Sequence, residues 1–393
     1  MLSSLFIFLI LVTTMITTTS VDAHLLSPEH VSISQPNSYS YPQTTVFEPK
    51  LIGQIGGATI AVAVQGNYAY IGKGARVQII DISNPSSPQI VGQSQLFNEA
   101  VYEISVAGNY VAVACRDDGT YILDISDPQN IQIESHILTT YSDSWDVVIS
   151  GNYLYIADAN SGLQIYDISD PTNPVLIPVY LSQPPAFNVT IAGSYAVVLE
   201  EYSFDSRVMY IYDISDPANR IPLGGYNPPD WPNDVSVAGN YAFIANGGSG
   251  LLVVDISNPR SPVEVAALDT PGYAKSVALT GNYAFIADTD AGLRVVDISD
   301  PTSPVEVAAL DTPGWAESVA LAGTYAFIAD ADAGLRVVDI RDPTSPVEVA
   351  ALDIFTLALD VESANGYIYV ADSVGGLYIL SGISQLYLPL IRR

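Results

Sequence analysis

Three aromatic residues stand at one position of successive sequence units. Trp231, Tyr273 and Trp315 each precede the glycine of a Gly-Asn-Tyr or Gly-Thr-Tyr turn by eight residues. Aromatic rings offer the surface on which sugar rings stack or cations bind, especially where carboxylates rim them. We therefore predict that these rings form an aromatic shelf for a ligand. The alternative is that they pack on one another beneath neighbouring loops.

Two acidic loops should lie on the same face as this shelf. They run over residues 288–292 and 330–334 and contain the carboxylates of Asp288, Asp290, Asp330 and Asp332. Each begins like a calcium loop, but both lack a third acid and the bidentate glutamate of an EF-hand. Hairpin turns are therefore the favoured interpretation. We expect no cofactor, and weak calcium binding is the alternative.

A second acidic set lies near the start of the innermost strand expected in each unit. Its members are Glu103, Asp146, Asp234 and Asp360. Like charges facing one channel raise one another's pKa unless a cation or water separates them. The set is interpreted either as solvated carboxylates at the mouth of the channel or as a cation site.

Residues for other chemistry are scarce. Only His136 lies within the repeats, so a His-paired nucleophile or a histidine-rich metal cluster is not expected. Paired carboxylates for glycoside hydrolysis remain possible in principle. A net charge of −29 repels phosphate backbones, which argues against nucleic-acid binding. Cys115 is the single cysteine, so no internal disulfide forms.

The aromatic and acidic candidate residues recur because the sequence repeats about every 42 residues. This repeat determines the architecture. One tyrosine closes the same turn in every unit, and successive spacings are 42, 43, 42, 46, 42, 42 and 42. The 46-residue spacing, between Tyr195 and Tyr241, contains an insertion at residues 200–207. The repeated tyrosines are Tyr68, Tyr110, Tyr153, Tyr195, Tyr241, Tyr283, Tyr325 and Tyr367.

Each unit contains four short runs of β-branched and aromatic residues bounded by Gly, Pro, Asn and Asp, which predicts four antiparallel strands. Several runs are apolar on both faces, so each sheet should be covered on both sides. We predict an all-β, eight-bladed β-propeller, with seven blades as the alternative. Residues 49–55 have the pattern of the fourth strand of a blade, but no first three strands precede them. The last unit has the first three strands of a blade and no fourth. The N-terminal strand should therefore complete the last blade.

Four segments divide the chain. Residues 1–23 resemble a cleaved signal peptide, with an apolar run from Leu5 to Val12 and small residues at a cleavage site. Residues 24–48 have the composition of a flexible linker. The propeller spans 49–382, and the tail 383–393 is too short to cross a membrane. We expect a secreted or cell-surface protein that is not an integral membrane protein after signal cleavage.

The third strands resemble the signature of the LVIVD repeat family. It occurs as Leu-Val-Val-Asp at 252–255, as Leu-Arg-Val-Val-Asp at 293–297 and 335–339, and as Leu-Gln-Ile-Tyr-Asp at 163–167. An Ile-Ser-Asp/Asn-Pro motif follows most copies, and its preceding aspartate should accept hydrogen bonds from the next turn. The resemblance implies a bacterial or archaeal secreted or surface propeller, without a settled activity.

These observations favour a non-catalytic scaffold, secreted or on the cell surface, that binds an extracellular protein or glycan through loops on one face. A rigid ring presents its loops with little ordering cost. The alternative is a hydrolase or lyase that acts on polysaccharide with two carboxylates.

Overall fold

The structure, a computed structural model, describes residues 50–55, 59–84, 87–138, 142–178, 184–203, 206–216, 221–352, 358–364, 367–373 and 375–381. All of them belong to the larger of the two units into which the chain divides, Val46–Arg393. The expected signal peptide, linker and tail lie outside the described residues. None of the described segments forms a helix long and apolar enough to cross a membrane.

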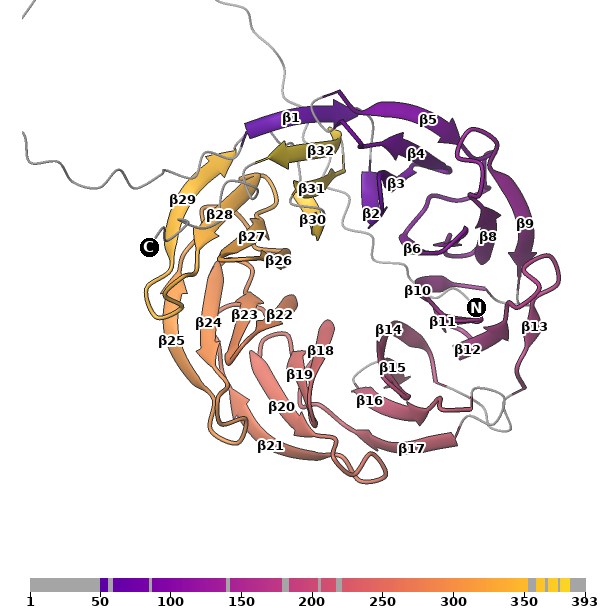
Figure 1. The fold of residues 1–393 in the computed structure, drawn as a ribbon. Helices are drawn as coiled ribbons and strands as arrows, with labels where there is room; N and C mark the ends of the chain where they lie inside the picture. Colours follow the sequence, from indigo (N-terminus) through magenta and orange to yellow (C-terminus); the bar gives the residue numbers. More distant parts are fainter. Residues whose placement is uncertain are drawn as a thin grey trace, which may run out of the picture. The chain divides into compact units, whose positions relative to one another are not determined.

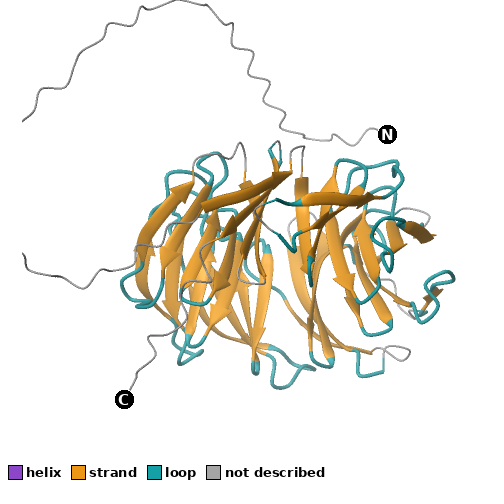
Figure 2. Ribbon diagram, turned by 45° about the horizontal axis from the view of Figure 1, so that its top comes forward, coloured by secondary structure: helices purple, strands orange, loops and turns teal. Residues whose placement is uncertain are grey.

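The described residues form eight four-stranded antiparallel sheets that follow one another around a ring (Figures 1 and 2). Sixteen strands make the first four blades: β2 (Thr59–Gln65), β3 (Tyr68–Lys73), β4 (Val77–Asp81), β5 (Gln89–Gln93), β6 (Glu103–Ala107), β7 (Tyr110–Ala114), β8 (Thr120–Asp124), β9 (Gln132–Ile137), β10 (Ser144–Ser150), β11 (Tyr153–Asp158), β12 (Gly162–Asp167), β13 (Val175–Leu176), β14 (Ala186–Ala192), β15 (Tyr195–Ser203), β16 (Ser206–Asp213) and β17 (Ile221–Tyr226).

The other sixteen strands make blades 5 to 8: β18 (Asp234–Ala238), β19 (Tyr241–Ala245), β20 (Leu251–Asp255), β21 (Val263–Leu268), β22 (Ser276–Thr280), β23 (Tyr283–Ala287), β24 (Leu293–Asp297), β25 (Val305–Leu310), β26 (Ser318–Ala322), β27 (Tyr325–Ala329), β28 (Leu335–Asp339), β29 (Val347–Leu352), β30 (Ala358–Ala364), β31 (Tyr367–Asp372), β32 (Gly376–Ser381) and, from the start of the chain, β1 (Lys50–Ile55). The first strand of each blade is innermost and the fourth is outermost (Figure 1).

The ring closes between the two ends of the propeller. β1 pairs antiparallel with β32, with Lys50 opposite Ser381 and Ile55 opposite Leu377. The eighth sheet therefore takes three strands from the end of the propeller and one from its beginning. Eight blades and closure by the N-terminal strand are both confirmed, and the seven-blade alternative is wrong.

The apolar core lies between blades. The middle strands are buried along most of their length, as in β23 and β24. Each of eight hydrophobic clusters joins two neighbouring blades, and one of them packs Val62 and Ile71 of blade 1 against Tyr369 and Leu377 of blade 8. Residues on both faces of a strand thus become buried only when two neighbours are in place.

The aspartates at the ends of the third strands hold the turns that follow. In six blades the backbone N–H of the serine two residues on donates to the aspartate, as Ser299 does to Asp297 at 2.8 Å. In blade 7 Arg341 donates to Asp339 in the same way. These hydrogen bonds lower the pKa of Asp297, as expected for a carboxylate that accepts them. The predicted structural role of the motif is confirmed.

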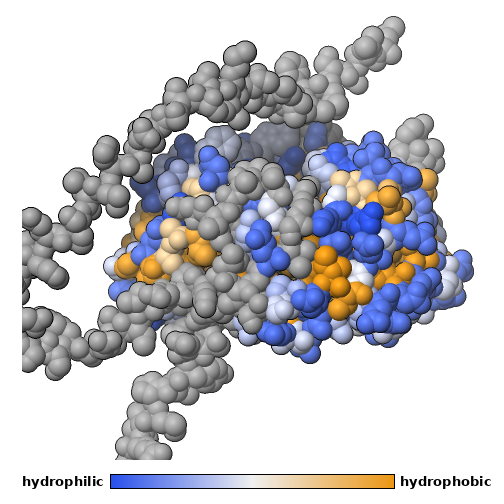
Figure 3. Space-filling model, turned by 90° about the horizontal axis from the view of Figure 1, so that it is seen from above, coloured by the Kyte–Doolittle hydropathy of each residue, from blue (hydrophilic) through white to orange (hydrophobic). Residues whose placement is uncertain are grey.

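The outer wall of the ring carries exposed apolar side chains at one repeated position. Val263, Val305 and Val347 begin three successive outermost strands and are each more than half exposed. The ladder between each of these strands and its neighbour contains a bulge. Bulges protect sheet edges from pairing with other chains. On the side of the ring seen in Figure 3, apolar and hydrophilic patches alternate.

Deleting residues 49–55 should destabilise the whole ring, because β32 and the junction between blades 8 and 1 lose their cover. We expect the midpoint of thermal unfolding to fall by roughly 5–15 °C, at about 2–4 °C per kcal/mol lost. Circular dichroism of the chain from residue 24 measures this, and deletion of residues 24–48 alone is the control. Equal midpoints in parent and deletion variant would contradict closure by β1.

Candidate functional site

One face of the ring carries both the connections between blades and the turns between the second and third strands; we call it the interblade face. On this face the two kinds of loop contact each other. Thr289, which follows β23, exchanges backbone hydrogen bonds of 3.0 and 3.2 Å with Ala316 in the connection to blade 7. Gly247 pairs with Ala274 in the same way one blade earlier. The prediction that the shelf and the acidic loops share a face is therefore confirmed.

The pairing requires an unusual backbone at the second residue after the second strand. Thr289 and Ala331 have φ values of 44° and 46°, and Arg116 has 49°. Non-glycine residues adopt this left-handed region only where surrounding contacts hold them. The bridges to the next blade supply those contacts, so the loops of this face are fixed in place.

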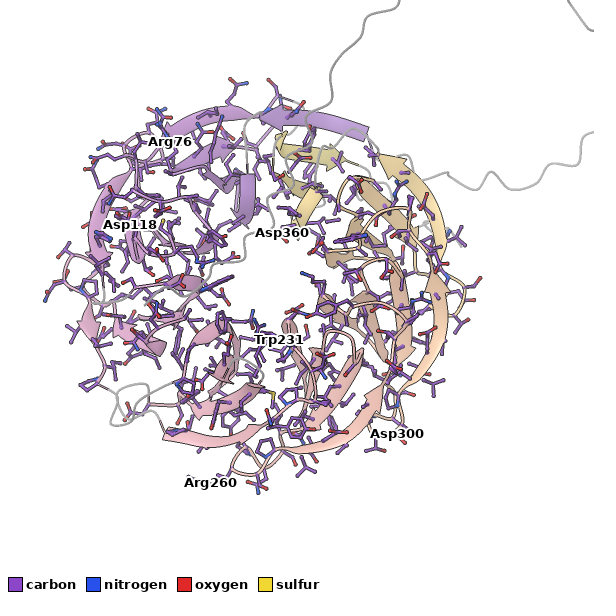
Figure 4. All side chains as sticks on the ribbon, turned by 180° about the vertical axis from the view of Figure 1, so that it is seen from behind. Arg76, Asp118, Trp231, Arg260, Asp300 and Asp360 are labelled. Atoms are coloured by element: carbon purple, nitrogen blue, oxygen red, sulfur yellow. The ribbon has the colours of Figure 1, made fainter. Side chains whose placement is uncertain are left out.

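The three shelf aromatics differ in exposure. Trp315 is 62% exposed, whereas Trp231 and Tyr273 are partly buried. The Tyr273 ring packs over Gly247, where an added Cβ would lie 3.0 Å from the tyrosine Cζ. In the part of the chain that the structure describes, no ring contact joins the three to one another. Trp231 lies on the inner side of the ring (Figure 4). Their role in binding stays a prediction.

The four loop carboxylates divide into two buried and two exposed groups. Asp288 is fully buried, accepts hydrogen bonds from Thr270 Oγ1 at 2.7 Å and from the Gly272 backbone N–H at 2.9 Å, and lies 3.7 Å from Arg294 Nε. Asp290 is exposed. Burial raises the pKa of Asp288, while these hydrogen bonds and Arg294 oppose the rise.

Blade 7 repeats this arrangement. Asp330 is fully buried and accepts hydrogen bonds from Thr312 Oγ1 at 2.6 Å, the Gly314 backbone N–H at 3.0 Å and Arg336 Nε at 3.3 Å. Asp332 is exposed. Asp288 and Asp330 therefore hold the connections that carry Tyr273 and Trp315, and they do not form the rim of the shelf. Only Asp290 and Asp332 are available to solvent.

A second set of aromatic side chains on this face was not predicted. Tyr102, Trp145 and Phe187 occupy one repeat position in blades 2, 3 and 4, six residues before the turn glycine instead of eight, and Trp145 and Phe187 lie within β10 and β14. Trp145 contacts Tyr102 and Phe187 edge-on, at centroid separations of 5.8 and 5.4 Å. Their common spacing before the turn glycine was the signal in the sequence that could have revealed them.

Two arginines lie between these rings and extend the set to the shelf. Arg116 Cζ lies 3.6 Å from the Trp145 ring centroid. Arg207 Cζ lies 4.9 Å from that of Phe187 and 4.4 Å from that of Trp231. Guanidinium groups stack favourably on aromatic faces. We call this set the arginine–aromatic row, which consists of Tyr102, Arg116, Trp145, Phe187, Arg207 and Trp231.

Charges along the row are locally balanced. Arg116 Nε lies 2.5 Å from Asp143 Oδ1, and Arg207 faces Glu201 in the register of β15 and β16. Burial lowers the pKa of Arg207, and Glu201 opposes that shift. The row is therefore an apolar and aromatic surface with polar edges and little net charge.

The inner-strand carboxylates connect neighbouring blades. Asp146 accepts a hydrogen bond from the Val189 backbone N–H at 2.8 Å, and Asp234 accepts one from Val277 at 2.9 Å. Asp360 lies on the inner side of the ring (Figure 4). It accepts from the Val361 N–H at 2.8 Å and from Ser318 Oγ of blade 7 at 3.4 Å. Burial by protein atoms raises the pKa of all three, although their side chains are only partly buried from solvent.

Glu103 accepts a hydrogen bond from the adjacent Ile104 N–H, at 3.0 Å. Within the described residues no group of three or more His, Cys, Asp or Glu side chains is placed to hold a metal ion. The cation and calcium interpretations stay predictions. Asp146, Asp234 and Asp360 are accounted for as acceptors that join innermost strands across blade boundaries.

The repeats match a known family model in seven segments that together span more than half of the chain. The chain belongs to the LVIVD repeat family. The unmatched unit is blade 4, which contains the insertion and Arg207. The matched segments are residues 56–95, 100–139, 142–182, 232–270, 271–312, 313–353 and 358–385. None of the curated proteins matches the sequence.

Solved structures share the fold of this LVIVD propeller at low sequence identity. The computationally designed protein Ika8 is 13% identical, with a TM-score of 0.69 over 84% of this chain and 98% of that one. Sqt1 of Chaetomium thermophilum, bound to the N-terminus of ribosomal protein L10, is 14% identical, with 0.67 over 84% and 99%. BamB of Moraxella catarrhalis is 12% identical, with 0.65 over 85% and 100%.

At such identities the likeness concerns the fold alone. A closed LVIVD propeller with fixed loops on one face is compatible with a scaffold or binding role. The interblade face presents aromatic rings, stacked guanidinium groups and exposed loop carboxylates.

Replacing Asp288 by alanine should cost about 1–3 kcal/mol, because Thr270 and Gly272 lose their buried acceptor. Asp290→Ala, two residues away but exposed, should change stability by no more than about 0.5 kcal/mol. Urea unfolding followed by circular dichroism compares the two. Equal effects would contradict the assignment of Asp288 as the group that holds the connection.

Asp146 should make stability depend on pH. Burial raises its pKa to about 6, against about 3.9 in the unfolded chain. The folded state retains the proton longer, so this contribution is complete below about pH 4 and is lost as the pH rises through about 6. The midpoint of thermal unfolding should therefore fall as the pH rises from about 4 to about 6, and Asp146→Asn should reduce this fall. Exposed Asp332→Asn is the control, and parallel curves for Asp146→Asn and parent would refute the prediction.

Proposed function

We propose that this LVIVD propeller is a non-catalytic scaffold, secreted or on the cell surface, that binds an extracellular protein or glycan through its interblade face. The observation that carries the proposal is the run of aromatic residues on that face in six successive blades, from Tyr102 in blade 2 to Trp315 in blade 7. Large aromatic side chains dominate the energetics of binding surfaces.

The rigidity of the face supports the same conclusion. Connections are fixed by buried Asp288 and Asp330 and by the bridges from Thr289 and Ala331 to the next blade. A surface that is already ordered loses little conformational entropy when a partner binds. Sqt1, a propeller of similar fold, is bound to the N-terminus of a ribosomal protein, so a protein segment is one reasonable class of partner.

Polysaccharide hydrolysis remains the rival function, and it would need two free carboxylates at a suitable separation. Asp146 and Asp234 each accept a backbone hydrogen bond from the next blade. Carboxylates engaged in this way are better suited to joining strands than to attacking a glycosidic bond. This favours the scaffold over the hydrolase.

Replacing Trp231 and Trp315 together by alanine should abolish binding without lowering the melting temperature by more than a few degrees. The parent and the double variant are compared on a glycan array and in affinity capture of extracellular proteins. We expect the parent to retain at least one defined partner that the variant loses.

Arg341→Ala provides the control, because Arg341 follows the third strand of blade 7 and lies on the opposite face. Equal retention of the partner by the parent and the double variant would contradict the proposal. So would the absence of any partner in both assays.

A further inference from the structure

One repeat position on the interblade face differs in its hydrogen bonding between blades. Asp288 and Asp330 occupy this position in blades 6 and 7, where each accepts from a threonine 18 residues earlier and a glycine 16 residues earlier. In blade 5 the same position is Asn246. The residues 18 and 16 positions before it are Pro228 and Asp230, and Pro228 has neither a hydroxyl nor an N–H.

Asn246 is fully buried, and neither its Oδ1 nor its Nδ2 has a hydrogen-bond partner among the described residues. Buried side-chain amides in proteins are normally paired, and an unpaired one costs about 1–3 kcal/mol. The connection that it would hold is instead fixed by Asp230, which accepts from the Trp231 N–H at 2.8 Å and from Ser249 Oγ at 3.4 Å. The amide is therefore not required to hold this connection.

The unpaired amide lies beside the shelf. A Cβ added to the next residue, Gly247, would come within 3.0 Å of both the Trp231 carbonyl oxygen and the Tyr273 ring. Arg207 stacks on Trp231 from the neighbouring blade. Asn246 thus lies where the arginine–aromatic row meets the aromatic shelf.

Another polar atom at this junction also lacks a partner. Within the described residues it is Nε of Arg207, a buried atom of a partly buried side chain in blade 4 that stacks on Trp231. Together with Asn246 it offers both donors and acceptors. A carboxylate could satisfy only the donors, whereas sugar hydroxyls both donate and accept, directly or through a bridging water.

We propose that the junction of blades 4, 5 and 6 is a carbohydrate subsite that takes a neutral sugar ring. Trp231 and Tyr273 supply the aromatic walls, and Asn246 and Arg207 supply the hydrogen-bonding groups. This inference rests on the proposed binding function of the interblade face and specifies its ligand class. The near-neutral charge of the row, with Arg207 opposite Glu201, suits an uncharged ligand.

An added peptide strand fits the junction less well. The innermost strands already use edge groups across the blade boundaries: Val277 N–H donates to Asp234, Ser236 Oγ donates to the Val277 carbonyl at 2.8 Å, and Thr190 Oγ1 donates to that of Val235 at 3.3 Å. Binding of a peptide by strand addition needs free backbone groups along an edge.

The test uses the chain from residue 24 with hexasaccharides of β-1,4-glucan, β-1,3-glucan, β-1,4-mannan and chitin as probes. Two of the three tryptophans, Trp145 and Trp231, lie in the arginine–aromatic row, so tryptophan fluorescence reports on the site directly, and calorimetry gives the dissociation constant. We expect saturable binding of at least one hexasaccharide, unchanged between low and high salt.

Asn246→Leu separates a binding role from a structural one. Its affinity for the hexasaccharide should fall at least tenfold, while its melting temperature stays the same or rises, because an unpaired polar group has been removed from the interior. Asp330→Leu at the same repeat position should instead lower the melting temperature. Trp231→Ala provides a second binding-deficient variant.

The outcomes separate the two proposals. If no hexasaccharide binds but a protein partner is retained by the parent and lost from the variant lacking Trp231 and Trp315, the carbohydrate subsite is refuted and the scaffold function stands. If neither class of ligand binds, both are refuted. Hexasaccharide binding that is unaffected by Asn246→Leu also refutes the subsite.

Discussion

Every sheet in this protein buries its two faces solely against its neighbours, and the rest of the structure depends on that constraint. The eight hydrophobic clusters each join two blades, so among the residues that the structure describes no blade has an apolar core of its own. A row of such sheets would leave an apolar face uncovered at each end. Closing the ring removes both ends, and pairing β1 with β32 joins the last blade to the start of the chain. The interblade face is rigid because its loops rest on this closed wall.

The architecture could be predicted from the sequence because several independent features of the repeat indicate the same fold. Eight turn tyrosines, the alternating apolar runs and the unmatched strand at residues 49–55 each indicate the same ring. The role of the aspartate in the Asp-Ile-Ser motif was also predictable, because its partner lies only two residues away, as with Asp297 and Ser299. Local hydrogen bonding leaves a local pattern in sequence, and repetition makes that pattern reliable.

The site was less predictable because its contacts are not local. Asp288 resembles a surface loop acid until Thr270 and Gly272, in the preceding connection, are seen to enclose it. The repeated Thr-Pro-Gly motif before Tyr273 and Trp315 was the available signal for that partnership. Arg116 and Arg207 gave no comparable signal, since each stacks on rings from a neighbouring blade. Contacts across blade boundaries depend on the rotation between sheets, which the spacing of one unit does not encode.

Repetition also explains how one position can take different roles. The residue after the second strand is Cys115 in blade 2, Asn246 in blade 5, Asp288 in blade 6 and Asp330 in blade 7, and all four are buried. Burial raises the pKa of the Cys115 thiol, as for a cysteine that packs as a small apolar side chain. The aspartates hold connections, and Asn246 does not. Because the wall of the ring is stabilised by all eight junctions together, one such position can lose its structural partner without loss of the fold. In the proposed carbohydrate subsite, the polar atoms of Asn246 serve the ligand instead.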